Sequence, residues 1–345
     1  MIELQTRPVA QPDTFSRPAR PAAEIMRVSN LGVRFATKSG IVEVVRDASF
    51  TLHAGETLAL VGESGSGKST LARALNGQIC PPFTPVRGEV TGRAEVLLDR
   101  GALDLVRADS ATMRKVRAHD IAMISQDALS GLNPVLSIAW QMTEALRVAE
   151  PRLPKAEALA RAAALLADVE LPDPAGALRR FPHQFSGGQR QRIMIAMALA
   201  RRPRVLIADE PTTALDATVQ SQVLRLLKRL QRQHGMAVIF ITHDLVVVSR
   251  IADRVAIMYA GEIVELTDVA RFRRAPRHPY TAGLLASRPG YGGSYPPLTG
   301  YAPSIRALPV GCAFRSRCPR AEAACALPVA SAEAGRDSLR CWRPL

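Results

Sequence analysis

The residues best suited to chemistry lie in one glycine-rich stretch that fits the pattern G-x-x-x-x-G-K-[ST] without a mismatch. The stretch consists of Gly62, Glu63, Ser64, Gly65, Ser66, Gly67, Lys68, Ser69 and Thr70. In such a turn, the backbone N–H groups and a helix N-terminus attract anions, and glycines let the backbone approach phosphate oxygens. Lys68 would reach the β- and γ-phosphates, and Ser69 would hold Mg²⁺. The stretch therefore predicts a nucleotide-phosphate site.

Two acidic residues supply a second part of such a site. Asp209 and Glu210 follow the apolar residues 205–208, so a buried strand would deliver both carboxylates at its carboxyl end. Asp209 fits the acid that holds Mg²⁺, and Glu210 is placed to polarise an attacking water. Such a pair is costly to bury unless it meets a cation. Gln126 and His243 follow further apolar runs, and His243 could hydrogen-bond the γ-phosphate. Either residue alone would be unremarkable. Their order along the chain, together with Lys68, Asp209 and Glu210, is what supports a role in the site.

The segments around these residues predict an α/β protein. Short apolar runs, typical of buried parallel strands, lie at residues 57–61, 121–125, 205–208 and 236–241. The carboxyl ends of such strands share one edge of a sheet, which is where ligands bind. A helix is predicted over residues 69–76, ended by Gly77. Alternating residues predict antiparallel strands at 31–35 and 48–53, and closing strands at 254–258 and 263–265.

Residues from about 129 to 200 predict an all-helical insertion in this α/β domain. Ile138, Met142 and Leu146 recur at the spacing of one helix face, and residues 155–169 are rich in alanine. The last predicted helix is apolar nearly all round, and it opens with Ser186, Gly187, Gly188 and Gln189. A serine and two glycines at a helix N-terminus form a second anion site.

Length and composition set limits on the class of protein. The 345 residues suggest about two domains, and 47% hydrophobic with 22% charged residues is typical of a globular chain. Residues 1–24 are predicted to be a disordered tail. The net charge of +14 would suit nucleic acid or an anionic membrane surface, but no block of like charges favours either over scattered arginines. No apolar run has the ~18–20 residues of a membrane span, and no secretory signal is present, so a cytosolic protein is predicted.

Ser186-Gly187-Gly188-Gln189 ahead of Asp209 and Glu210 resembles the signature of ATP-binding-cassette (ABC) ATPases. The resemblance implies a P-loop NTPase (RecA-like) core, with an antiparallel β subdomain and the inserted helical subdomain, over residues 25–275. It also implies that two cassettes pair head to tail around two ATP molecules, so that the signature helix of one completes the site of the other.

The same resemblance assigns roles to single residues. Glu210, His243, Lys68 and Gln126 would take part in catalysis, with Gln126 sensing both Mg²⁺ and a membrane partner. Other assigned residues are Phe35, as the aromatic that stacks on adenine, and Asp216, in a loop at the dimer interface. Taken as a bare residue, Phe35 is more often an ordinary core aromatic.

The chain is similar in particular to the ATP-binding subunits of bacterial oligopeptide/dipeptide importers. His278-Pro279-Tyr280 and the cysteine-bearing segment of residues 311–319 carry this likeness, within a C-terminal extension over 276–345. It implies a second cassette (a paralogue or a second copy), two membrane permease subunits, a periplasmic solute-binding protein, and a place on the cytoplasmic face of the inner membrane. No nucleic acid is then expected. A soluble ABC ATPase acting on nucleic acid and an exporter ATPase are the alternatives.

Four cysteines in the extension are spaced C-x5-C-x6-C-x15-C, unlike the C-x2-C pairs of zinc ribbons. They are Cys312, Cys318, Cys325 and Cys341. Disulfides are unexpected in a reducing cytosol, and four thiolates suit Zn²⁺ or an iron–sulfur cluster. The resemblance favours [4Fe–4S] over zinc, and an unmetallated tail that folds by apolar packing is the alternative.

Overall fold

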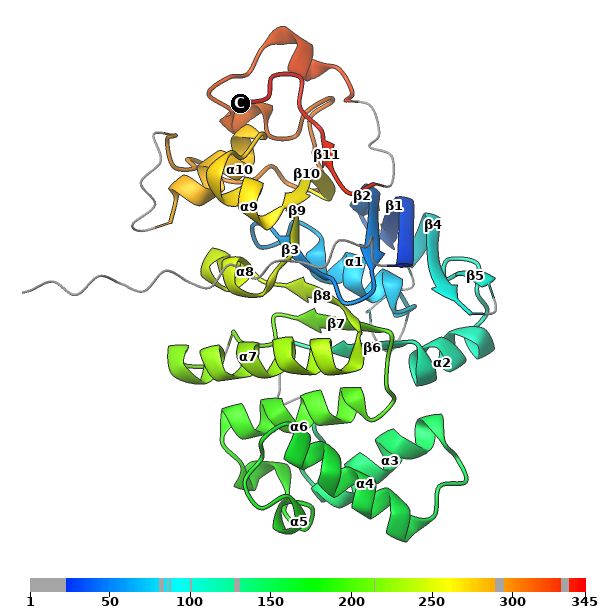
Figure 1. The fold of residues 1–345 in the computed structure, drawn as a ribbon. Helices are drawn as coiled ribbons and strands as arrows, with labels where there is room; N and C mark the ends of the chain where they lie inside the picture. Colours follow the sequence, from blue (N-terminus) through cyan, green and yellow to red (C-terminus); the bar gives the residue numbers. More distant parts are fainter. Residues whose placement is uncertain are drawn as a thin grey trace, which may run out of the picture.

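The computed structural model describes residues 23–80, 84, 86, 88–99, 101–126, 131–213, 215–288, 295–329 and 335–345. The predicted tail over 1–24 lies almost wholly outside these residues. Figure 1 shows the sheets in the middle of the molecule, a lobe of helices below them and the C-terminal extension above. None of the helices that the structure describes is long and apolar enough to cross a membrane.

The larger sheet carries the phosphate loop. Among the described residues it has seven strands in the order β11-β10-β9-β3-β8-β7-β6. Five adjacent strands, from the edge strand inward, are parallel: β6 (Ile121–Ile124), β7 (Val205–Asp209), β8 (Ala237–Ile241), β3 (Thr57–Val61) and β9 (Arg254–Tyr259). Two antiparallel strands extend it: β10 (Glu262–Asp268) and β11 (Ser338–Leu339). The apolar runs of the sequence correctly predicted four of these parallel strands, whereas β9, predicted as a closing strand, is the fifth.

The smaller sheet is antiparallel, in the order β2-β1-β4-β5. Its strands are β1 (Glu24–Thr37), β2 (Gly40–His53), β4 (Gly88–Leu98) and β5 (Gly101–Asp104). β1 and β2 are both 14 residues long, far longer than the alternating pattern predicted. Four register shifts interrupt their pairing, and each shift changes which residues face the core. The bulges therefore hid the strands from a period-of-two pattern.

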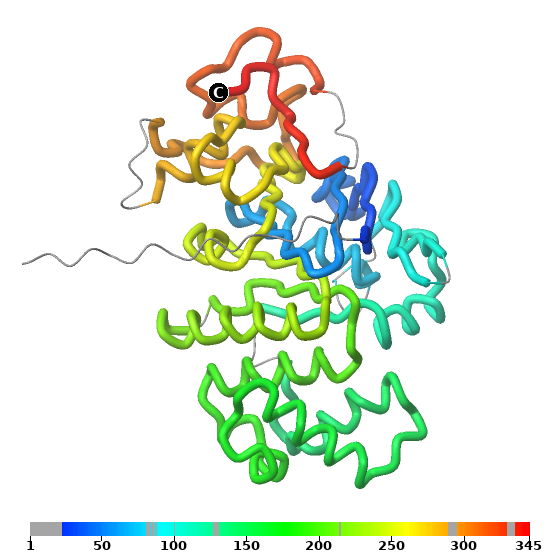
Figure 2. The backbone as a smooth tube through the Cα atoms, in the orientation of Figure 1, coloured from blue at the N-terminus to red at the C-terminus, as the bar shows by residue number. Residues whose placement is uncertain are grey.

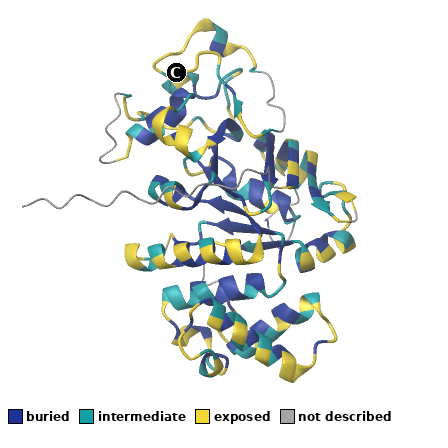
Figure 3. Ribbon diagram, in the orientation of Figure 1, coloured by how far each residue is buried: buried dark blue, intermediate teal, exposed yellow. Residues whose placement is uncertain are grey.

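The larger sheet is covered on both faces, and successive residues of its strands alternate between two cores. Val205 and Ile207 join the core that contains α1 (Lys68–Leu75), α2 (Ser110–His119) and the smaller sheet. Leu206 and Ala208 join the core on the other face, with the helical lobe. The strands therefore appear almost entirely buried in Figure 3, whereas the lobe helices alternate buried and exposed residues.

The helical lobe confirms the predicted insertion. Its helices are α3 (Ile138–Ala149), α4 (Lys155–Asp168), α5 (Pro174–Ala177) and α6 (Gly187–Leu199), and a 3-10 turn covers Pro182–Gln184. α7 (Ala217–His234) lies between the lobe and the sheet (Figure 2). Ile138, Met142 and Leu146 all face the shared core, as their spacing predicts.

The C-terminal extension packs on the end of the sheet that carries β9 and β10. Helices α8 (Leu245–Ile251) and α9 (Val269–Arg274) precede the extension, which contains α10 (Pro279–Ala286) and 3-10 turns at Arg315–Arg317 and Ala323–Ala326. Phe314 packs edge-on against Tyr259 and Tyr280. Arg254 of β9 is buried and donates to the carbonyls of Thr51, Gly335 and Arg336 and to the Glu56 carboxylate.

His278 begins α10 and is fully buried. Its Nδ1 accepts a hydrogen bond from the backbone N–H of Tyr280 at 3.0 Å, and its own N–H donates to Glu265 at 2.9 Å. Burial lowers the pKa of His278 from 6.5 to about 4. The folded protein therefore holds this ring neutral at neutral pH.

The pKa of His278 predicts a loss of stability in acid. Between pH 6.5 and about 4 the unfolded chain binds a proton at His278 that the folded chain does not, so unfolding becomes easier as pH falls through this window. His278→Asn should weaken the pH dependence of thermal unfolding there, because asparagine can still cap α10 but does not titrate. His183→Asn, at an exposed histidine, is the control. Equal pH slopes for the native protein and His278→Asn would contradict the prediction.

Candidate nucleotide-binding site

The phosphate loop joins β3 to α1, at the carboxyl edge of the parallel strands. Lys68 is the first residue of α1, and its Nζ donates to the carbonyls of Gly62 at 2.8 Å and Glu63 at 2.9 Å and to Ser66 Oγ at 3.3 Å. Burial lowers the pKa of the Lys68 ammonium, against the opposing effect of the nearby Glu210, Asp209 and Glu63. The ammonium is thus fixed on the loop, and its burial strengthens its attraction for phosphate.

Two glycines of the loop have no room for a side chain. Gly67 has φ +100, and a Cβ there would lie 2.7 Å from the carbonyl oxygen of Val44. A Cβ at Gly62 would lie 2.2 Å from the carbonyl oxygen of Met258. The loop is therefore held tightly against β2 and β9.

Asp209, the last residue of β7, reaches the phosphate loop. By the alternation of the strand it lies on the α1 face, where its Oδ1 accepts a hydrogen bond from Ser69 Oγ at 3.0 Å. Burial raises the pKa of Asp209, and the bond from Ser69 opposes this rise. A hydroxyl and a carboxylate side by side are oxygen ligands of the kind Mg²⁺ prefers. These two predicted magnesium ligands are thus brought together.

Glu210 gathers three polar side chains around its carboxylate. Its φ is +47, so the chain bends out of the line of β7 at this residue. Glu210 Oε2 accepts from Gln126 Nε2 at 3.3 Å and Thr213 Oγ1 at 2.8 Å, and it lies 3.2 Å from His243 Nδ1. The carboxylate is partly buried, while the His243 side chain is 59% exposed. The segments that follow β6, β7 and β8 thus meet at the Glu210 carboxylate. Thr213 also contacts this carboxylate, and the sequence did not predict that contact.

The signature segment lies elsewhere in the chain. Ser186 caps α6: its Oγ accepts from the Gln189 N–H at 3.3 Å, and Gln189 Oε1 accepts from the Ser186 N–H at 3.0 Å. Gly188 is close to α7, since a Cβ there would lie 2.5 Å from Val219 Cγ1. α6 belongs to the core on one face of the sheet and α1 to the core on the other. No hydrogen bond within the described chain joins the signature residues to the phosphate loop.

The remaining predicted residues lie around these two groups. Asp216 caps α7, accepting from the N–H groups of Thr218 at 3.0 Å and Val219 at 2.9 Å, whereas the neighbouring Ala214 lies outside the described residues. Phe35, in β1, is half-buried and packs against the core that contains α1. Ser64 and Gly65 are exposed at the tip of the phosphate loop.

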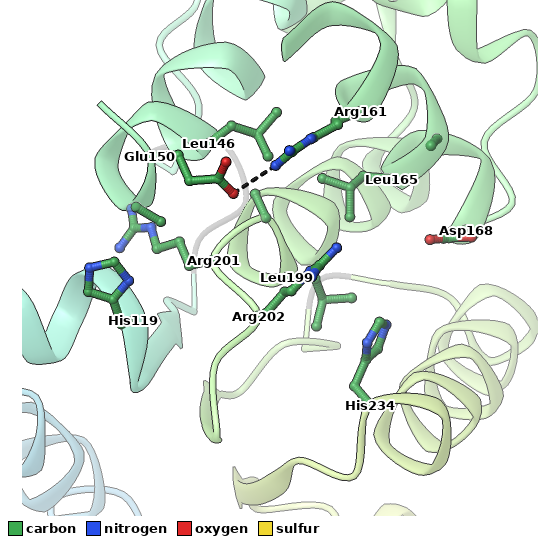
Figure 4. Close-up of a pocket in the computed structure, with 13 residues that line it drawn as sticks. His119, Leu146, Glu150, Arg161, Leu165, Asp168, Leu199, Arg201, Arg202 and His234 are labelled. Carbon is green, nitrogen blue, oxygen red and sulfur yellow. Dashed lines mark hydrogen bonds and ion pairs between the residues drawn. The ribbon is translucent and has the colours of Figure 1, made fainter. Parts of the chain in front are cut away.

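A cavity of about 670 Å³ opens beside Ser69, Gln126 and Asp209. Arg73, Arg117 and Arg201 also line it. A different cavity, of about 400 Å³, lies between the helical lobe and the sheet and is shown in Figure 4. His119 and His234 in its wall lie two and three residues before the starts of β6 and β8, so it opens at the opposite end of the strands from Asp209. It is therefore separate from the phosphate loop.

The four cysteines of the extension are neighbours, but they do not form a metal site as they stand. Burial raises the pKa of Cys312 to about 11, and the other three thiols contribute to the rise. Burial likewise raises the pKa values of Cys318 and Cys341. Over the described ranges, no group of three or more His, Cys, Asp or Glu side chains is placed to hold a metal ion.

A strand, a phosphate loop and paired acids at one sheet edge, together with a helical insertion that begins a helix at Ser186, define a nucleotide-binding cassette of the ABC class. The ABC transporter family model matches residues 45–213, and the oligopeptide/dipeptide transporter C-terminal region matches residues 264–325. The chain belongs to the family of ABC-transporter ATP-binding proteins, and it is an ATPase that uses ATP and Mg²⁺.

Two relatives are similar over almost their whole length. The dipeptide transport ATP-binding protein DppD of Bacillus subtilis is 43% identical over 324 residues, covering 92% of this chain and 94% of the relative. The oligopeptide transport ATP-binding protein OppD of Escherichia coli is 41% identical over 349 residues, covering 100% and 98%. The dimeric cassette MJ0796 bound to ADP and phosphate matches with a TM-score of 0.61 and 26% identity, covering 71% of this chain and 99% of that one. The predicted fold class is thereby confirmed.

Proposed function

We propose that this ATPase drives the import of dipeptides, oligopeptides or a related solute as the energy-coupling subunit of an ABC importer. The observation that carries the proposal is the pairing of a cassette site, in which Lys68, Asp209 and Glu210 meet, with an extension that matches the peptide-transporter C-terminal region. Glu210 would activate the attacking water, Lys68 and Mg²⁺ would neutralise phosphate charge, and Gln126 and His243 would align the water and the γ-phosphate.

The site needs a second cassette to become complete. The signature helix begins at Ser186 on the face of the sheet opposite α1, so its anion-binding end is free to meet the ATP of a partner. ATP held between two cassettes closes the pair, and loss of the γ-phosphate releases it. The dimeric neighbour bound to ADP and phosphate supports this arrangement. The partner is a paralogue or a second copy of this chain.

The helical lobe provides a surface for the permease. Val135, Trp140 and Phe181 are large apolar side chains that the lobe leaves exposed. The backbone of α3 hydrogen-bonds to the segment before Phe181, through Ile138 N to Arg180 O, so these residues belong to one region. Together with Gln126 they would contact two membrane subunits, which places the protein peripherally on the cytoplasmic face of the inner membrane, with a periplasmic solute-binding protein acting indirectly.

Peptide uptake tests the proposal. Cells in which the native chain is replaced by Lys68→Ala should lose most ATP-dependent uptake of radiolabelled di- and tripeptides, because the phosphates lose their buried cation. Cells with Lys38→Ala, at an exposed lysine in the turn between β1 and β2, should keep it. Normal peptide uptake with Lys68→Ala would refute the proposal. Tight, salt-sensitive binding of DNA or RNA by the purified chain would instead favour the nucleic-acid ATPase that its charge of +14 suggests.

We also propose a [4Fe–4S] cluster on Cys312, Cys318, Cys325 and Cys341, with Zn²⁺ as the less favoured occupant. Their mutual proximity supports it, and the thiols would have to deprotonate to bind metal. Anaerobically purified protein should be brown, absorb near ~400 nm and contain iron. Cys325→Ser should lose colour and iron, whereas Cys80→Ser should keep both. A colourless native protein that contains zinc would exclude the iron–sulfur cluster.

A further inference from the structure

The C-terminal extension contacts the phosphate loop at Glu63, the second residue of the loop. Arg317 donates from Nη1 and Nη2 to the two carboxylate oxygens of Glu63, at 2.8 and 2.9 Å. The hydroxyl of Tyr280 accepts a hydrogen bond from the backbone N–H of Glu63 at 3.0 Å. Both the side chain and the backbone of this one loop residue are thus held by the extension.

Arg317 is itself fixed before it reaches Glu63. Its Nε donates to the carbonyl of Thr299 at 2.8 Å, and its Nη1 lies 3.3 Å from the hydroxyl of Tyr259. Its guanidinium lies 5.7 Å from the centre of the Tyr259 ring and 5.8 Å from that of Phe314. The Arg317 side chain is 6% exposed, against 30% for Glu63. A planar guanidinium held in this way makes a strong, directional pair with a carboxylate.

The peptide between Gly62 and Glu63 is held from both sides. Its carbonyl oxygen accepts from Lys68 Nζ at 2.8 Å, and its N–H donates to Tyr280. The C=O and N–H of a trans peptide point in opposite directions, so Tyr280 and Lys68 fix the same peptide plane. The hydrogen bond to Tyr280 therefore favours the peptide orientation in which the Gly62 carbonyl accepts from Lys68 Nζ.

The charge on Glu63 reaches the phosphate site. Glu63 raises the pKa of Lys68 against the effect of burial, although its effect is smaller than those of Glu210 and Asp209. Without a cationic partner, the Glu63 carboxylate would repel a polyphosphate chain bound at the loop. The bidentate pair with Arg317 cancels that charge.

We propose that Arg317 and Tyr280 are positioning residues for the phosphate loop, so that the nucleotide affinity of the cassette depends on its C-terminal extension. Arg317 neutralises Glu63, and Tyr280 orients the Gly62–Glu63 peptide. The inference rests on the ATP binding described above.

Two substitutions break the same ion pair with different results. Arg317→Met leaves a bare carboxylate beside the phosphates. The dissociation constant of the full-length chain for the fluorescent analogue TNP-ATP, measured with Mg²⁺ present, should therefore rise about tenfold. Glu63→Gln removes that carboxylate, so it should raise the dissociation constant clearly less than Arg317→Met does. The double variant Glu63→Gln with Arg317→Met should recover most of the affinity that Arg317→Met alone loses. Arg317→Lys keeps the charge but loses the bidentate geometry, so its affinity should lie between that of the native chain and that of Arg317→Met.

The controls separate charge from folding. Arg320→Met removes an exposed arginine of the same extension, which contacts the carbonyl of Pro344, and should not change affinity. Tyr280→Phe keeps the ring and removes the acceptor of the Glu63 N–H, and it should weaken binding several-fold. Equal losses with Glu63→Gln and Arg317→Met, or no recovery in the double variant, would overturn the inference. A native chain that binds no nucleotide would overturn the ATPase function instead.

Discussion

Replacing Glu210 with glutamine should stop ATP turnover while leaving ATP bound. Glutamine has nearly the same shape and can keep a contact with Thr213, but it cannot accept a proton from the attacking water. Loss of a general base lowers turnover by about 100- to 10,000-fold. Phosphate release measured on the assembled transporter should show this loss, and size-exclusion chromatography should show a cassette dimer that persists with ATP.

Glu43→Gln is the matched control for this experiment. Glu43 lies in β2, where its carboxylate pairs with Arg34 at 3.0 Å. The control should hydrolyse ATP at nearly the native rate, since it changes one carboxylate to an amide outside the site. Turnover by Glu210→Gln within about threefold of the native rate would remove Glu210 from its assigned role.

Changing Ser186 to aspartate should abolish turnover without harming nucleotide binding by the isolated chain. Aspartate is as good a helix cap as serine, so α6 should begin as before. Its negative charge would, however, lie where the γ-phosphate of the partner's ATP is expected, and we expect turnover to fall about 100-fold or more. The isolated chain should still bind TNP-ATP normally, because its own phosphate loop is untouched.

Ser186→Asn separates charge from shape in this position. Asparagine has the size of aspartate and also caps helices well, but it carries no charge. We expect it to retain most of the ATPase activity. If Ser186→Asp and Ser186→Asn lost activity equally, the effect would be steric; if Ser186→Asp lost nucleotide binding in the isolated chain, the signature would act within one subunit.

The parallel core could be predicted because its strands are short, apolar and end in distinctive residues. Residues 205–208 are buried on both faces, so their sequence is continuous rather than alternating, and the acids that follow mark the carboxyl edge. That Gln126, Glu210 and His243 share one sheet edge could be predicted from the apolar runs that precede them, but the contacts centred on the Glu210 carboxylate could not. The left-handed backbone of Glu210 also leaves no trace in the residue type.

The contacts of the extension were the least predictable part of the site. The sequence places Tyr280 in a His-Pro-Tyr pattern and Arg317 in the cysteine-bearing segment of residues 311–319, and neither position indicates a contact with the phosphate loop. Arg317 and Glu63 are 254 positions apart, and no periodicity links such positions. Their meeting depends on how Phe314, Tyr259 and Tyr280 pack together, which follows from shape and not from pattern.

Buried Arg254 has a consequence for how the protein is made. Two of its acceptors, the carbonyls of Gly335 and Arg336, belong to the last eleven residues of a 345-residue chain. A growing chain lacks these two carbonyls until residues 335 and 336 have been made. Before that point, the Arg254 guanidinium has Thr51 and Glu56 as acceptors to offset its removal from water. The cassette should therefore complete its folding only once residues 335 and 336 have left the ribosome, and a chain that stops short of residue 335 should be a target for proteolysis rather than a working ATPase.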